Sequence, residues 1–114
     1  MSSANSETFE RCVKSILELI VLKSLQDEAM CGYDIIATVH KKYYTLLSPG
    51  TIYPMLASLE KDGLLERTED QKRRVYKITQ KGGETVSALF GIYLKILAMS
   101  RPQETEDVDV EGLT

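Results

Sequence analysis

Residues 47–56 read Leu-Ser-Pro-Gly-Thr-Ile-Tyr-Pro-Met-Leu, and they contain the most informative helix signals in the chain. Ser48 and Pro49 form the strongest helix start in the chain, because a serine hydroxyl caps the first turn and proline already has the φ angle of the first helical position. Gly63 ends the helix after Asp62, since glycine readily follows a last helical turn. The sequence therefore predicts a helix that starts at Pro49 and ends near Asp62.

The two faces of this helix have different chemistry. At 100° per residue, four apolar side chains form one stripe that faces a core: Ile52, Met55, Leu56 and Leu59. The opposite face is small and carries a single lysine; it consists of Gly50, Pro54, Ala57, Ser58 and Lys61, flanked by Thr51 and Tyr53. Such a face can approach another surface closely. Because Pro54 lacks a backbone N–H, we expect a distortion of the helix at that residue.

Hydrophobic periodicity and turn residues predict the remaining elements. They are helices over residues 7–25, 32–43 and 79–100, and strands over residues 64–67 and 74–78. The second helix is predicted to carry Tyr33, Ile36, Ala37 and His40 on one side. The two strands form a hairpin with a short, highly charged link, and the hairpin must pack against the helices because two strands alone are unstable.

The charge is distributed unevenly along the chain. The 114 residues carry 14 basic and 17 acidic side chains, a net charge of −3. Five of the acids lie in residues 102–114, which contain almost no apolar residues and read as a disordered tail. Residues 31–81 carry nine basic and six acidic side chains. The middle of the chain is therefore basic, which favours a nucleic-acid partner.

The order of elements is helix, helix, short turn, helix, charged hairpin, helix. Two helices joined by a tight turn and followed by a basic hairpin are typical of a winged helix-turn-helix. We therefore predict a mainly α fold with a small β-hairpin. Residues 1–80 are predicted to form the DNA-binding domain, residues 81–100 a C-terminal dimerisation helix, and residues 101–114 the acidic disordered tail.

The predicted partner is double-stranded DNA. The N-terminus of the third helix offers backbone N–H groups and a positive dipole end to a phosphate, and Gly50 lets the backbone come close. The outer side chains of that helix can enter the major groove, and the hairpin cations can reach phosphates or the minor groove. The predicted DNA-binding residues are Lys41, Ser48, Gly50, Thr51, Tyr53, Pro54, Ser58, Lys61, Lys72, Arg73, Arg74 and Lys77.

Several of these residues have an alternative, purely structural role. Tyr53 can pack on the second helix, and Thr51 can serve only the first turn of its own helix. Arg73 and Arg74 can be solvated hairpin charges, and Lys41 can complement the C-terminal dipole of the second helix.

The last helix predicts a dimer. Between Ala88 and Met99 the only charged residue is Lys95, and a helix that is apolar on all sides needs burial all round. A chain of this size cannot readily provide that burial for a terminal helix. The predicted homodimer contacts are Phe9, Val13, Leu89, Ile92, Ile96 and Leu97.

The residues contain no candidate catalytic or metal site. Cys12 and Cys31 lie in no CxxC motif, and we interpret both as small buried hydrophobes. His40 is the single histidine, and no glycine-rich phosphate loop is present. We predict no enzyme activity, no cofactor and no metal.

The apolar stretches are much shorter than the roughly 20 residues that span a bilayer. Residues 1–7 have neither the basic region nor the apolar core of a signal peptide. We therefore expect a cytoplasmic protein without a membrane partner.

Three blocks of sequence resemble the PadR family of transcriptional regulators: residues 32–35, residues 47–56 with residues 59–65, and residues 72–79 together with Gly82. The resemblance spans roughly residues 16–90. It implies a homodimeric winged-helix repressor of the short subfamily, with a swapped or interlocked C-terminal helix.

The resemblance also implies a small apolar or phenolic effector near the dimer centre. Similar regulators that stack planar drugs use a tryptophan on the last helix, which this chain lacks. Phe90, Tyr93 and Leu97 are the candidate ligand walls; their alternative role is dimer core. The usual glycine at the wing tip is replaced by residues 69–71, so a longer and more acidic turn is expected.

The predicted function is a sequence-specific, DNA-binding transcriptional regulator, a homodimeric repressor released by a small apolar ligand. One alternative is a winged-helix module that binds protein through the same helix face and does not bind DNA. A further alternative is a small-molecule carrier that uses the dimer cavity.

Overall fold

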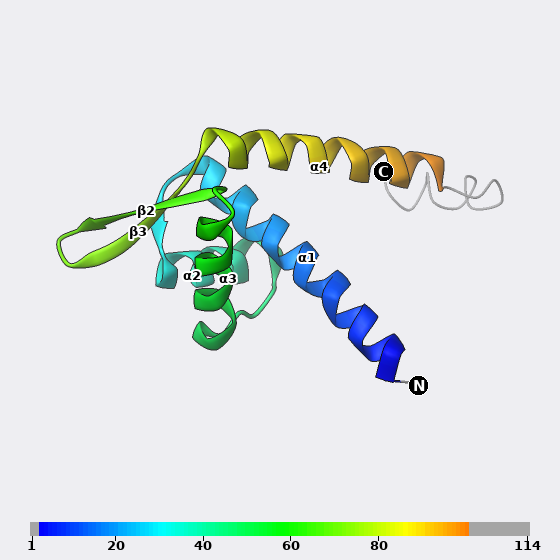
Figure 1. Cartoon of the computed structure of the whole chain (residues 1–114), viewed down its shortest axis with the longest axis horizontal. Helices are drawn as coiled ribbons and strands as arrows, with labels where there is room; N and C mark the ends of the chain where they lie inside the picture. The colour runs from blue at the N-terminus through cyan, green and yellow to red at the C-terminus, as the bar shows by residue number, and fades with distance from the viewer. Residues whose placement is uncertain (1–2, 101–114) are drawn as a thin grey trace.

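The computed structural model describes residues 3–100, and the predicted acidic tail lies outside these residues. Within them the chain forms four helices and three strands (Figure 1). In chain order these are α1 (Ser3–Asp27), β1 (Met30–Cys31), α2 (Gly32–Tyr43), α3 (Pro49–Lys61), β2 (Leu65–Asp70), β3 (Arg73–Ile78) and α4 (Gln80–Met99). The predicted winged helix-turn-helix architecture is confirmed.

Local capping determines where α3 and α4 begin. The Ser48 hydroxyl accepts a hydrogen bond from the Thr51 backbone N–H at 3.2 Å. The Thr79 hydroxyl does the same for the N–H of Gly82 at 3.0 Å. Gly63 has φ +81°, in the left-handed region that glycine adopts without steric cost. Helix α3 runs without interruption through Pro54.

The core lies where α1, α2, α3, the sheet and the first turns of α4 meet. The predicted stripe of α3 is buried in it, as Ile52, Met55, Leu56 and Leu59 expose 4% of their surface or less. Val21 and Leu25 of α1, Ile35 and Val39 of α2, Tyr76 of β3 and Val86 of α4 complete its centre. The predicted domain boundary at residues 80 and 81 stays a prediction, and Val86 shows that α4 begins on this same core.

The sheet has three strands in the order β1-β3-β2, all antiparallel. The sequence predicted only the hairpin. Strand β1 pairs Met30 with Tyr76 and Cys31 with Val75, and a two-residue strand is too short to show the alternation that marks strands.

The hairpin turn is tighter than expected. Asp70 pairs with Arg73, so only Gln71 and Lys72 form the turn. Both residues have positive φ, 52° and 69°, as the favoured two-residue hairpin turns require. The prediction of a longer turn was wrong because cross-strand pairing continues up to Asp70 and Arg73, which leaves two residues for the turn.

The side of α2 that carries Tyr33 and His40 is not its buried side. Ile35 and Val39 face the core, whereas Tyr33 is 71% exposed and His40 is exposed. Successive residues of a helix point 100° apart, and α2 carries apolar residues on two sides, so the sequence pattern alone did not identify the buried side. The prediction of buried cysteines was wrong as well, since Cys12 is exposed and Cys31 is half-buried.

Helices α1 and α4 project from this body toward the same side and separate toward their free ends (Figure 1). The projecting part of α4 leaves large apolar side chains uncovered, including Leu94 at 63%, Leu97 at 69% and Met99 at 83% exposed. Phe9 on α1 is 68% exposed. Over residues 3–100, no helix is long and apolar enough to cross a membrane.

Candidate nucleic-acid interface

The outer face of α3 is open, as the sequence predicted. Gly50, Thr51, Pro54, Ser58 and Lys61 are all exposed. Ser48 is exposed too, and its hydroxyl donates to the Thr51 hydroxyl at 3.2 Å while it accepts from the Thr51 backbone N–H. Thr51 therefore does serve the first helical turn, and the proton of its own hydroxyl remains available to an outside acceptor.

Tyr53 is half-buried and lies against the start of α2. A Cβ atom added to Gly32 would come within 2.6 Å of three atoms at the hydroxyl end of the Tyr53 ring. Burial raises the pKa of Tyr53 above 10.0, with smaller contributions from neighbours that include Tyr33, and Arg74 acts in the opposite direction. The packing role of Tyr53 is thus present, and its hydroxyl stays protonated at neutral pH.

Tyr53 lies at a hollow of about 460 Å³, which we call the wing hollow. Its lining residues come from three separate parts of the chain: Cys31, Gly32, Tyr33, Tyr53, Lys72, Arg73 and Arg74. The structure therefore brings four of the predicted DNA-binding residues together. It adds Tyr33, which was not among the predicted DNA-binding residues.

The cations of the wing hollow are free of close acidic partners within the described chain. Among residues 3–100, the ion pairs within 4.0 Å are Lys42–Asp27 at 3.4 Å and Arg67–Glu60 at 3.7 Å. Across the hairpin, Glu69 pairs in register with Arg74, and Asp70 with Arg73. These carboxylates lower the net charge of the wing without lining the hollow.

The other predicted cations are spread more widely. Lys61 is the last residue of α3, and Lys77 lies opposite Glu66 in the hairpin. Lys41 is near the far end of α2, about 12 Å along the helix axis from Tyr33 at 1.5 Å per residue. The structure does not bring these three residues into the wing hollow.

A second hollow, of about 360 Å³, lies between α1 and α4, and we call it the apolar hollow. All three predicted ligand walls line it: Phe90, Tyr93 and Leu97. The other lining residues are Ile16, Leu19, Ile20, Lys23, Tyr43 and Ile96. Lys23 is the single charged residue among them, and its Nζ lies 5.3 Å from the centre of the Phe90 ring, a cation–π distance.

The predicted dimer contacts fall into four places. Ile92 is exposed on α4, while Ile96 and Leu97 line the apolar hollow. Leu89 packs partly against the core of its own chain.

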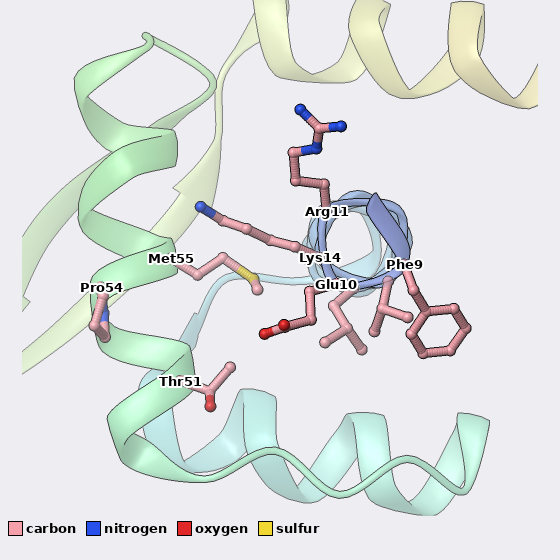
Figure 2. Close-up of a pocket in the computed structure, with 9 residues that line it drawn as sticks. Phe9, Glu10, Arg11, Lys14, Thr51, Pro54 and Met55 are labelled. Atoms are coloured by element: carbon pink, nitrogen blue, oxygen red, sulfur yellow. The ribbon is translucent and has the colours of Figure 1, made fainter. Parts of the chain in front are cut away.

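Phe9 and Val13 line a third hollow, of about 500 Å³, between α1 and α3. Figure 2 shows this hollow, with Glu10 and Lys14 directed toward α3 and Phe9 directed away from it. Among residues 3–100, no group of three or more His, Cys, Asp or Glu side chains could hold a metal.

Residues 21–88, more than half of the chain, match the transcriptional regulator PadR-like family. The chain belongs to this family. Membership confirms the predicted class, a transcriptional regulator rather than an enzyme. In this PadR-like protein, α2, α3 and the three strands lie within the matched residues, and residues 89–99 of α4 lie beyond them.

Two curated relatives of this PadR-like protein are transcriptional activators. One is GvpE from Haloferax mediterranei, 41% identical over 61 residues, which cover 54% of this chain and 31% of GvpE. The other is GvpE2 from Halobacterium salinarum, 40% identical over 60 residues, which cover 53% of this chain and 31% of GvpE2. The matched segment is thus about a third of the length of either relative.

Solved structures share the fold over most of its length. A PadR-like transcription factor from Bacteroides fragilis has a TM-score of 0.72 at 26% identity, covering 82% of this chain and 94% of its own. A PadR-like regulator from Bacillus cereus has a TM-score of 0.71 at 29% identity, covering 78% of this chain and 91% of its own. F93 from STIV is described as a winged-helix DNA-binding protein. It has a TM-score of 0.67 at 26% identity, covering 71% of this chain and 90% of its own.

Proposed function

We propose that this PadR-like regulator binds double-stranded DNA, with the outer face of α3 in the major groove and the wing against the backbone. The observation that carries the proposal is the juxtaposition of two surfaces. The face of α3 is small and exposed, and the wing hollow beside it gathers Lys72, Arg73 and Arg74. The description of F93 as a DNA-binding protein of the same fold supports this function.

Selection of bound DNA from a random pool, at fixed salt, supplies the operator for the test. Arg74→Ala should weaken operator binding equally for all base sequences and lower the salt slope by about one unit. Lys42→Ala is the charge-matched control, because Lys42 is exposed near the end of α2, pairs with Asp27 at 3.4 Å and does not line the wing hollow. Thr51→Ala should instead relax the preference at particular bases.

A chain that retards no DNA at low salt would favour the alternative, a winged-helix module that binds protein. Uniform losses for both Arg74→Ala and Thr51→Ala would contradict the assignment of α3 to base recognition.

The functional unit is proposed to be a homodimer held together by α4 and supported by α1. The support is the row of uncovered apolar side chains on α4, among them Ile92 at 53% and Leu94 at 63% exposed. Exposed apolar surface of this kind marks association sites. A two-fold dimer would also present two copies of α3 to two half-sites.

Ile92→Asp tests the dimer, because a charge at an exposed position does not disturb the fold of one chain. We expect sedimentation equilibrium to show a monomer, with a large loss of operator affinity. Ser87→Asp, also exposed on α4, is the control and should remain dimeric. A wild-type protein that sediments as a monomer would overturn the dimer.

The apolar hollow between α1 and α4 is the proposed effector site. Its walls are apolar apart from Lys23, whose charge is 5.3 Å from the Phe90 ring centre. The ligand class that fits is a small apolar molecule, including a phenolic one whose oxygen can lie near Lys23. Phe90→Ala should abolish ligand-induced release of the operator while leaving DNA binding itself intact. Release that is unchanged in this variant would contradict the assignment.

Repression is the proposed regulatory effect. Because two relatives are named as activators, the test must distinguish repression from activation. A bound dimer represses when its operator overlaps the promoter. Transcription in vitro from the selected operator should fall as protein is added. A rise would instead make this chain an activator.

A further inference from the structure

The wing hollow has the lining of an anion site. Its seven lining residues include three cations and two tyrosines, and none of the seven is acidic. The volume of about 460 Å³ is far larger than the roughly 30 Å³ share of one water molecule. An anionic group with its attached atoms can therefore enter it.

The donors converge from three directions. Lys72, Arg73 and Arg74 approach from the wing, Tyr53 from α3, and Tyr33 from the first turn of α2. A backbone phosphate carries its negative charge on two non-bridging oxygens, each of which can accept several hydrogen bonds, and guanidinium groups bind phosphate through paired hydrogen bonds.

The start of α2 adds further hydrogen-bond donors for an anion. Cys31 is the N-cap of α2, and its side chain makes no capping hydrogen bond. The first-turn N–H groups of a helix bind anions when no side chain satisfies them. Asp34 lies in this first turn but is exposed and does not line the hollow.

Tyr33 is the residue whose position needs an explanation. Its side chain is 71% exposed, although it borders a hollow beside the outer face of α3. Tyr53 lies at the same hollow with its ring against Gly32, where no side chain would fit. A helix that precedes a recognition helix ordinarily crosses the DNA backbone. Tyr33 is therefore placed to donate its hydroxyl to a phosphate.

We propose that the wing hollow binds one phosphate group of the DNA backbone, held between the Tyr33 hydroxyl and the cations of residues 72–74. This inference rests on the proposed DNA binding and goes beyond it, because it assigns Tyr33 and a single phosphate. A free phosphorylated molecule has the same chemistry and is the competing source of the ligand.

The test uses the full chain and an operator in which one phosphate at a time is replaced by a neutral methylphosphonate. One backbone position should weaken wild-type binding about tenfold, as expected for a hydrogen bond to a charged group. Tyr33→Phe should weaken binding to the unmodified operator by a smaller factor, because the cations of residues 72–74 remain, and the same methylphosphonate should then cost less affinity than it costs the wild type. Tyr44→Phe is the control, because Tyr44 is 90% exposed and does not line the hollow.

Three results would overturn the proposal. One is Tyr33→Phe binding as wild type, and another is a Tyr33→Phe loss that no single phosphate position shares. The third result would identify a free phosphorylated molecule as the ligand. In that case inorganic phosphate, titrated without DNA, would shift the amide signals of residues 31–33 and 72–74, while no phosphate position of the operator would couple to Tyr33. If the wild-type chain bound no DNA at all, the proposed function itself would fail, which is a distinguishable outcome.

Discussion

The Thr79 hydroxyl donates a hydrogen bond to the backbone carbonyl of Gly63 at 2.7 Å, and this contact joins the start of α4 to the end of α3. Two further bonds support it: the Thr79 N–H donates to the Leu64 carbonyl at 3.1 Å, and Lys81 Nζ donates to the Asp62 carbonyl at 3.0 Å. The proposed dimer helix is thereby tied to the C-terminal end of the proposed recognition helix. The orientation of α4 therefore bears directly on the orientation of α3.

Removal of the Thr79 hydroxyl should loosen this junction. Thr79→Val loses both the bond to Gly63 and the cap on the Gly82 N–H, and we expect a loss of about 1–2 kcal/mol in the free energy of unfolding. Urea denaturation measures it. Thr85→Val is the control, since the Thr85 hydroxyl only donates to the Lys81 carbonyl within α4. Equal stability of the two variants would show that the junction contributes nothing.

Two neighbouring glycines should respond in opposite directions. A Cβ at Gly82 would collide with the backbone carbonyl of Leu64 and lie 2.7 Å from Ile78 Cγ1, whereas a Cβ at Gly83 meets no atom within 4 Å. Gly82→Ala should destabilise the fold by about 2 kcal/mol or more, because the carbonyl cannot move aside. Gly83→Ala should stabilise it by about 0.5–1 kcal/mol through helix propensity. Thermal unfolding of the pair checks both signs, and a tolerated Gly82→Ala would mean that the α4 start is free to shift.

The wing turn holds a non-glycine residue with positive φ at each of its two positions. Gln71→Gly should stabilise the hairpin by about 0.5–1 kcal/mol, because glycine adopts the φ of 52° without steric cost. Gln71→Val should destabilise it, since a β-branched residue is poorly tolerated there. Amide hydrogen exchange along β3 reports the local change. Slower exchange in the valine variant than in the glycine variant would refute this turn geometry.

Tyr53 should make the stability depend on alkaline pH. Its pKa is raised in the folded chain above the 10.0 of an unfolded tyrosine, chiefly by burial. Below pH 10 both states hold the proton, so stability is unaffected. Above it the unfolded state loses the proton first, and the free energy of unfolding falls as pH rises. The fall between pH 9 and 11 should be smaller in Tyr53→Phe, and identical slopes would contradict the raised pKa.

Local signals made α3 predictable from the sequence. Ser48, Pro49 and Gly63 lie within the helix or next to it, and the stripe from Ile52 to Leu59 repeats at the helical period. These features depend on contacts between residues only a few positions apart. The same stretch also carries the clearest resemblance to the PadR family.

Tertiary structure decided what depends on contacts distant in sequence. Strand β1 exists because residues 30 and 31 pair with β3, and the tight wing turn follows from the pairing of Asp70 with Arg73. The buried face of α2 was set by its neighbours, which left Tyr33 outside.

The wing hollow shows most clearly the difference between local sequence signals and contacts distant in sequence. It joins residues 31–33, residue 53 and residues 72–74. The sequence by itself determined that the wing is basic and that the outer face of α3 is small. Only the packing of α2, α3 and β3 around one core placed Tyr33 beside those cations, because no spacing along a chain encodes the distance between segments that fold together.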